Sequence, residues 1–514
     1  MRIHFFFRTT ALFLIFLMLL TAVACGKGNV PAEPTTAMTT SAAISETASA
    51  TNEVTTATTT LYADNLPADL NYNGEVVTFI YREEIAGEFW AESVTGDIVN
   101  DAIHKSILSV EERLGVDIQA VLRKGHTKDV RTEYNNHIIN QIMAGDDTYD
   151  WVDMMVAYSG GQAQTGAYCN LLTLNHLDLE QPWYISGLEE DISIADRLFF
   201  VIGDASLGYL KSAFCIYYNR DLAKNLQVED MEALALDGKW TFEKVMQIAQ
   251  QGAQDLNGDG KYDLSDQLGF VSHDSNHPRG FIGSTGMHLM TKKEDGSHAY
   301  TFGSDRDHAV CTVISTLQND TPGSYFFNGS NSTPSKVSDY NQISEFFVSG
   351  RILMITAKMD DVIACGYHMM EDEYGVLPYP KYEEDQAQYS TLSRTIHNSF
   401  LMPITCPDPE MAAAVLEALG SSKYATVMPT YFETALKTKY SYDTTASKIF
   451  DIIHDSMGLE FGYVYSNTLN SAPIAAYTNV LKNINSFASS IKAQGNMIGK
   501  LYDKMIESIH EKCE

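Results

Sequence analysis

Two apolar runs frame the first part of the globular chain: Glu-Val-Val-Thr-Phe-Ile-Tyr at 75–81 and Asp-Trp-Val-Asp-Met-Met-Val at 150–156. Both runs are rich in β-branched and aromatic residues, which is typical of buried strands, and 116–121 has the same character. Between these strands, apolar residues recur at helical spacing in 97–114 and 130–143. This alternation predicts βαβ units, and therefore an α/β fold whose mainly parallel sheet binds ligands outside the carboxyl ends of its strands.

Length and charge set the broad class of the protein. The chain has 514 residues, of which 45% are apolar and 20% charged, so it is globular with room for about two or three domains. Its 66 Asp and Glu residues outnumber 35 Lys and Arg residues, and the formal net charge is −31. Because such an acidic surface repels phosphate, we exclude nucleic acid as a partner.

The N-terminus has the pattern of an export signal. Arg2 and Arg8 form a positively charged region at the start of the chain. An apolar run follows at 11–20, and small residues then precede Cys25. This run is shorter than the about 20 residues that span a bilayer, so 1–24 is predicted to be a signal peptide; a short anchor that stays attached is the alternative. The cysteine after small residues resembles the lipobox of bacterial lipoproteins, which implies that Cys25 carries a lipid.

A low-complexity segment follows the predicted lipidation site. Residues 31–60 consist mainly of Thr, Ala and Ser, with no Lys, Arg or aromatic residue. Such a segment buries too little apolar surface to offset its ordering entropy, so 25–65 is predicted to be a disordered tether for a globular body that begins near Leu66. The other cysteines lie singly, without CxxC or Cys/His clusters, and we therefore expect no zinc site.

The rest of the chain continues the alternation of strands and helices. The further predicted elements are strands at 198–202, 214–218 and 352–355, a helix capped by Thr241, an extended crossing at 375–381, a helix at 407–419 and a mainly helical part at 446–514. No internal repeat is present in the sequence, which argues against a repeat architecture.

Five short segments carry a resemblance to a known family. They read IMAGDDTYD at 142–150, IYYNRDL at 216–222, GKWTF at 238–242, FVSGR at 347–351 and GVLPYPK at 375–381. In this order they resemble the extracellular solute-binding proteins of ABC importers, in particular the large carbohydrate-binding lipoproteins of Gram-positive bacteria. The similarity extends over roughly residues 66–514.

The resemblance implies a two-lobed, periplasmic-binding-protein-like fold of type II, with each lobe a mainly parallel sheet flanked by helices. The first lobe would be 66–215 plus 382–425 and the second 219–376 plus 426–514, with hinge crossings near 214–219 and 374–381. It also implies a monomer on the outer face of the cell membrane that closes around an extracellular carbohydrate, here an oligosaccharide. The loaded protein would deliver this ligand to the membrane subunits of an ABC permease.

The sharpest motif in the chain is Asp-Leu-Asn-Gly-Asp-Gly-Lys-Tyr-Asp-Leu-Ser-Asp at 255–266, which fits D-x-[DN]-x-[DN]-G. Calcium takes about six to eight oxygen ligands, and alternate positions of such a loop aim oxygens inward. We expect a structural calcium site whose ligands are Asp255, Asn257, Asp259, the backbone carbonyl of Lys261, Asp263 and Asp266. The final Asp resembles dockerin-type loops, and an acidic solvated turn is the alternative.

Sugar rings pack on aromatic faces, while their hydroxyls bond to carboxylates, amides and Arg. Residues of these types follow several of the predicted strands. The ligand-binding candidates are Arg82, Glu83, Trp90, Tyr158, Asp204, Asp360 and Tyr367, with Asp361, His397 and Asn398 as further candidates. The alternatives are surface packing for Trp90 and a turn for Asp204. Trp151, Trp183 and Trp240 are expected in the core.

Catalytic motifs do not occur in the sequence. It contains no HExxH, GxSxG or GxxxxGK[ST] string, so we expect no enzymatic activity. The alternatives to a sugar receptor are a surface glycoside-processing enzyme with two facing carboxylates, an adhesion module, or a peptide-binding importer receptor.

Overall fold

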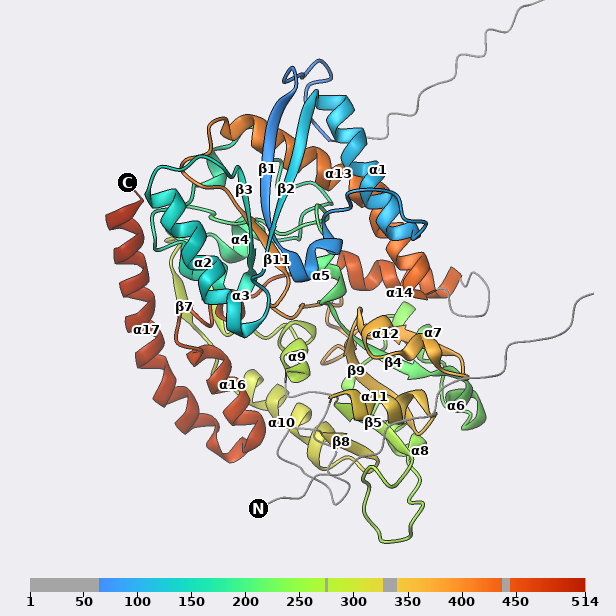
Figure 1. The fold of residues 1–514 in the computed structure, drawn as a ribbon. Coiled ribbons are helices and arrows are strands. Elements are labelled where there is room, and N and C mark those ends of the chain that lie inside the picture. The colour runs from blue at the N-terminus through green and yellow to red at the C-terminus, as the bar shows by residue number, and fades with distance from the viewer. Residues whose placement is uncertain (1–63, 273–275, 327–339, 437–443, 514) are drawn as a thin grey trace, which may run out of the picture. The chain divides into compact units, whose positions relative to one another are not determined.

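The computed structural model describes residues 64–272, 276–326, 340–436 and 444–513 (Figure 1). The signal peptide, the lipidated Cys25 and nearly all of the tether lie outside these residues and stay predictions. Within the described ranges, no helix has both the length and the apolar character needed to cross a membrane.

The first sheet has four strands in the order β11-β3-β1-β2. β1 (Glu75–Arg82) pairs in parallel with β2 (Val116–Arg123) and with β3 (Trp151–Met155), and β11 (Asn398–Leu401) runs antiparallel beside β3. Every residue of β3 is buried, which explains why its sequence is almost continuously apolar. The three strands predicted at 75–81, 116–121 and 150–156 are therefore confirmed.

Two long helices connect the strands of this sheet, as predicted. α1 (Ile98–Leu114) begins after Asp97, whose carboxylate accepts the Asn100 amide, and ends at Gly115 with a left-handed φ of 60°. α2 (Lys128–Met143) joins β2 to β3. Later in the chain, α13 (Pro409–Leu436) packs along α1.

The second sheet has five strands in the order β10-β4-β9-β5-β8. These are β4 (Phe214–Asn219), β5 (Leu268–Ser272), β8 (Ser324–Phe326), β9 (Ile352–Lys358) and β10 (Tyr374–Leu377). β5 pairs in parallel with β8 and β9, but β4 is antiparallel to β9 and β10. This sheet is therefore mixed rather than mainly parallel. The chain enters it along β4 and leaves it along β10 toward β11, and these two strands run antiparallel to each other. The exact lobe boundaries stay a prediction.

The remaining elements are mostly short. The helices are α3 (Val156–Gln162), α4 (Leu188–Ile192), α5 (Gly208–Lys211), α6 (Arg220–Asn225), α7 (Met231–Leu236), α8 (Phe242–Gly252), α9 (Gly280–Ser284), α10 (Asp305–Asn319), α11 (Tyr340–Val348), α12 (Asp361–Ala364), α14 (Thr444–Asp455), α15 (Phe461–Val464), α16 (Ala472–Lys482) and α17 (Phe487–Lys512). The 3₁₀ helices are η1 (Glu83–Glu88), η2 (Leu171–Thr173), η3 (His277–Arg279), η4 (Tyr367–Met369) and η5 (Ile484–Ser486), and β6 (Met290–Lys292) pairs with β7 (His298–Tyr300). The predicted C-terminal helices are confirmed.

Two local predictions need correction. The apolar run at 198–202 is buried but is not a regular strand. Val201 alone in this run exchanges backbone hydrogen bonds with Phe400 of β11. β11 instead forms its regular strand pairing with β3. Thr241 does occupy the position before α8, but its side chain makes no capping hydrogen bond.

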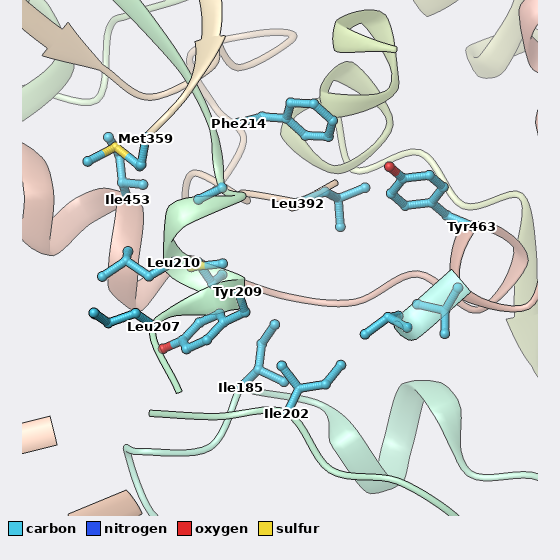
Figure 2. Close-up of a cluster of buried hydrophobic side chains, with 14 of the residues drawn as sticks. Ile185, Ile202, Leu207, Tyr209, Leu210, Phe214, Met359, Leu392, Ile453 and Tyr463 are labelled. Carbon is cyan, nitrogen blue, oxygen red and sulfur yellow. The ribbon is translucent and has the colours of Figure 1, made fainter. Parts of the chain in front are cut away.

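A buried apolar cluster surrounds α5 and the start of β4 (Figure 2). Figure 2 labels Ile185, Ile202, Leu207, Tyr209, Leu210, Phe214, Met359, Leu392, Ile453 and Tyr463. Hydrophobic burial at this junction, worth about 25 cal/mol per Å², fixes α5 and the start of β4 against α14 and the end of β9. The burial expected for three tryptophans is confirmed, since Trp151, Trp183 and Trp240 are at most 1% exposed.

Candidate functional site

A pocket of about 690 Å³ lies at the end of α14. It is lined by residues 179–190 apart from Trp183, by Tyr209 of α5, by Lys292 of β6, and by His454, Asp455 and Met457. This volume falls within the roughly 300–1,000 Å³ of small-molecule sites. By the predicted lobe ranges, 179–190 and Tyr209 belong to the first lobe and the other lining residues to the second.

Buried polar contacts hold the loop that forms one wall of the pocket. The Tyr184 hydroxyl donates to Glu417 Oε2 at 2.7 Å, and Glu417 of α13 is 1% exposed. Burial raises the pKa of Glu417 to about 7. The Asp204 amide donates to Trp183 O at 2.8 Å, and a Cβ atom at Gly203 would lie only 2.3 Å from that oxygen. Only glycine at position 203 lets the backbone come this close to Trp183 O. This contact holds the loop against residues 203–204.

A chain of polar groups runs along another wall. Tyr209 Oη donates to Asp204 Oδ1 at 2.5 Å and lies 3.2 Å from His454 Nε2, while His454 Nδ1 lies 3.1 Å from Asp455 Oδ1. Burial alone would lower the pKa of His454, but bonds and attraction to Asp204 and Asp455 outweigh it and raise this pKa to about 9. At neutral pH the ring is therefore a cation between two carboxylates.

Asp204, a predicted ligand-binding residue, lies behind this wall rather than in it. Its side chain is fully buried, burial raises its pKa, and its Oδ2 has no hydrogen-bond partner in the part of the chain that the structure describes. It touches the pocket through Tyr209 and His454, which do line the cavity.

Three other predicted ligand-binding residues lie at the end of β1. Arg82 is 1% exposed, and its Nε and Nη2 donate to Asp153 at 2.7 and 2.9 Å. Glu83 is exposed at the start of η1, and Trp90 is half-buried against the core. The Arg82 guanidinium is thus occupied by a buried ion pair, whereas Glu83 remains open to solvent.

The last three lie after β3 and β9. The half-buried Tyr158 accepts a hydrogen bond from Arg131 Nη1 at 2.9 Å, and the guanidinium lies over its ring. Asp360 pairs with Lys211 at 3.4 Å and with Lys358 at 3.7 Å. Tyr367 is fully buried in a T-shaped contact with Tyr217. None of the seven predicted residues lines the pocket, and their role in binding stays a prediction.

The further candidates are buried as well. Asp361 is fully buried and pairs with Lys358 at 2.8 Å. His397 lies 2.9 Å from Ser393 Oγ, and burial lowers its pKa to about 4. Asn398 begins β11.

The sequence did not single out the residues that do line the pocket. Tyr184 follows Trp183, which the sequence analysis places in the core. The Trp-Tyr pair after a proline is the one local feature of the sequence that points to this loop. Tyr209, Lys292, His454 and Asp455 belong to three separate elements, and no motif in the sequence links them.

The loop at 255–266, where calcium is expected, connects α8 to β5. Asp255 accepts the amides of Gly258 and Gly260 at 2.6 and 2.8 Å, and Asp266 accepts those of Leu256 and Asp263 at 2.9 Å. The side chains of Asn257, Asp259 and Asp263 each accept a hydrogen bond from the backbone amide two residues later in the chain. For Asp259 the donor is the amide of Lys261. In the described part of the chain, no three His, Cys, Asp or Glu side chains converge as a metal site. The donor set fits calcium chemically, since it is all oxygen.

Comparisons with known proteins identify the fold. No family model and no curated protein matches the sequence. A sugar transporter from Rhizobium etli in an open conformation has a TM-score of 0.55 at 13% identity, over 82% of this chain and 99% of that one. The galacto-N-biose-/lacto-N-biose I-binding protein of an ABC transporter from Bifidobacterium longum has a TM-score of 0.52 at 12% identity, over 85% and 98%.

A third similar structure is the GacH receptor of Streptomyces glaucescens, with a TM-score of 0.50 at 14% identity over 84% of this chain and 99% of that one. GacH was solved unliganded and with acarbose. These neighbours are named as receptors, binding proteins or transporters, and they confirm the expected periplasmic-binding-protein-like fold.

Proposed function

We propose that this protein captures an oligosaccharide outside the cell and passes it to an ABC permease without altering it chemically. The observation that carries the proposal is the pocket of about 690 Å³, whose walls come from segments assigned to both lobes. A ligand that contacts both sides favours the closed arrangement, because only that state gains all of its contacts. The fold, shared with sugar-binding receptors, supports the same function.

The walls offer the mixed chemistry that a saccharide needs. Tyr184 and Tyr209 line the cavity and are held in place by their hydroxyl hydrogen bonds, and Ile185 and Leu188 add apolar lining. Carboxylates and backbone groups of 186–190 supply acceptors and donors for hydroxyls.

Titration calorimetry against neutral oligosaccharides and peptides tests this function. A Ser186→Trp variant places an indole on the exposed lining position Ser186 and should abolish binding. Ser489→Trp, on exposed α17 and outside the lining, is the matched control and should bind as the wild type does. Binding of peptides alone would favour a peptide receptor, and absence of any binding would contradict the proposal.

The lipid anchor belongs to the same proposal. A diacylated Cys25 would hold the protein at the outer face of the membrane, next to its permease. Labelling with a radioactive fatty acid, lost in a Cys25→Ala variant, tests the anchor. Unchanged labelling of the variant would contradict it.

We also propose that the loop at 255–266 binds a structural calcium ion through Asp255, Asn257, Asp259, Lys261 O, Asp263 and Asp266. The all-oxygen donor set supports this role. Tyr262 lies inside the loop and is 36% exposed, so excitation of tyrosine should sensitise terbium luminescence if the ion binds there. Tyr262→Leu should strongly reduce the signal without abolishing calcium binding in calorimetry, whereas Asp255→Asn with Asp259→Asn should abolish both. Unchanged calcium binding in the double variant would refute the site.

A further inference from the structure

The rim of the pocket carries carboxylates that the protein leaves without partners. Glu180, Glu189 and Glu190 all line the cavity and are exposed. Among the described residues, none of their carboxylates takes part in a hydrogen bond or an ion pair; only the backbone oxygen of Glu189 accepts a bond, from Lys292. Three negative charges are therefore available to a ligand.

The two cations of the lining are, in contrast, already paired with protein groups. Lys292 Nζ donates to Ser193 Oγ at 2.9 Å and to Glu189 O at 3.3 Å. His454 is held between Asp455 and the buried Asp204. The lining thus sets four carboxylates, those of Glu180, Glu189, Glu190 and Asp455, against these two cations, and its net charge is negative.

The buried carboxylate behind the wall adds to the negative potential. Asp204 Oδ2 has no hydrogen-bond partner among the described residues. Glu190 further opposes ionisation of its neighbour Asp191, whose pKa burial and this repulsion raise to about 6. An added negative charge in the pocket would face repulsion from several sides, and an added positive charge would gain attraction.

We propose that the pocket selects positively charged saccharides, those carrying a free amino group, over neutral ones, and excludes anionic saccharides such as uronates. This inference rests on the proposed function, since it assigns a charge class to the same ligand. The selectivity comes from Glu189 and Glu190 at the rim, with Glu180 and Asp455 beside them.

A matched ligand series tests the selectivity. For each neutral oligosaccharide that binds, calorimetry is repeated at pH 6.5 with derivatives in which one hydroxymethyl group is converted to an aminomethyl group or to a carboxylate. At low salt the amino derivative should bind about three- to tenfold more tightly than the carboxylate derivative, and 0.5 M salt should narrow the gap.

Charge-neutral variants identify the residues responsible. Glu189→Gln with Glu190→Gln should reduce the amino-over-carboxylate ratio by about three- to tenfold. The control, Glu112→Gln with Glu507→Gln, removes the same charge from exposed sites on α1 and α17 outside the lining and should leave the ratio unchanged.

The outcomes separate the two proposals. Equal or tighter binding of the carboxylate derivative, or an equal change in the control variant, overturns the charge selectivity while the sugar-receptor function stands. If no saccharide of any charge binds, both proposals fail.

Discussion

One buried lysine has no counter-charge among the described residues. Lys423 of α13 is fully buried, and its Nζ donates to Phe89 O and Ala205 O at 2.8 Å each. The ammonium also lies 4.2 Å from the centre of the Phe89 ring. Burial lowers the pKa of Lys423 to about 7. Lys423 thus ties the segments before Trp90 and after Asp204 to one helix.

This depressed pKa makes a signed prediction for stability. Between pH 7 and the unfolded-state pKa of about 10.4, the unfolded chain holds a proton that the folded chain has lost, so the free energy of unfolding rises with pH. At about 1.36 kcal/mol per pKa unit, the wild type should gain roughly 2 kcal/mol between pH 7 and pH 9 relative to a Lys423→Met variant.

Urea unfolding of both proteins at several pH values measures this difference. The comparison removes effects common to both chains, such as growing repulsion at high pH. Lys105→Met, at an exposed position of α1, controls for the loss of one positive charge. A wild-type-minus-variant difference that is flat, or that falls as pH rises, would refute the assignment of a neutral buried amine.

The other predictions concern buried contacts, and urea unfolding measures each of them. Asp153→Ala should destabilise the protein by about 3–5 kcal/mol, because Arg82 would keep a buried charge without the carboxylate that pairs with it; a loss below about 1 kcal/mol would contradict this. Because the folded pKa of Glu417 is raised to about 7, stability should fall as pH rises from about 4.5 to 7, by up to roughly 3 kcal/mol, and Glu417→Gln should abolish this fall; an unchanged slope would be inconsistent with it. Gly269→Ala should cost about 1–3 kcal/mol or more, because its Cβ would lie 1.8 Å from Ala249 O, and a neutral effect would contradict that packing.

The first sheet could be predicted because its signals are local. The strands around Phe79 and Trp151 are short apolar runs, and Asp97 and Gly115 mark the ends of the helix between β1 and β2. The direction of strands in the second sheet was not readable in the same way. β4 pairs with β10, and Tyr218 faces Gly375 across more than a hundred residues of sequence, so no local pattern encodes that antiparallel pairing.

Site residues were harder to predict because burial and pairing are set by distant contacts. Arg82 was expected to face a ligand, but Asp153, 71 residues away, holds it in the core. His454 gains its role in the pocket wall from Tyr209, 245 residues away. Residue type and strand ends identify candidates, whereas accessibility depends on partners that only the folded chain brings together.

An experimental structure of the protein with a bound oligosaccharide would locate the binding site. We predict that the sugar lies in the pocket between residues 179–190 and residues 454–457, in contact with Tyr209 and near Glu189. A sugar bound instead beside Trp90 and Tyr158, with this pocket empty, would contradict the proposal that this pocket is the sugar-binding site.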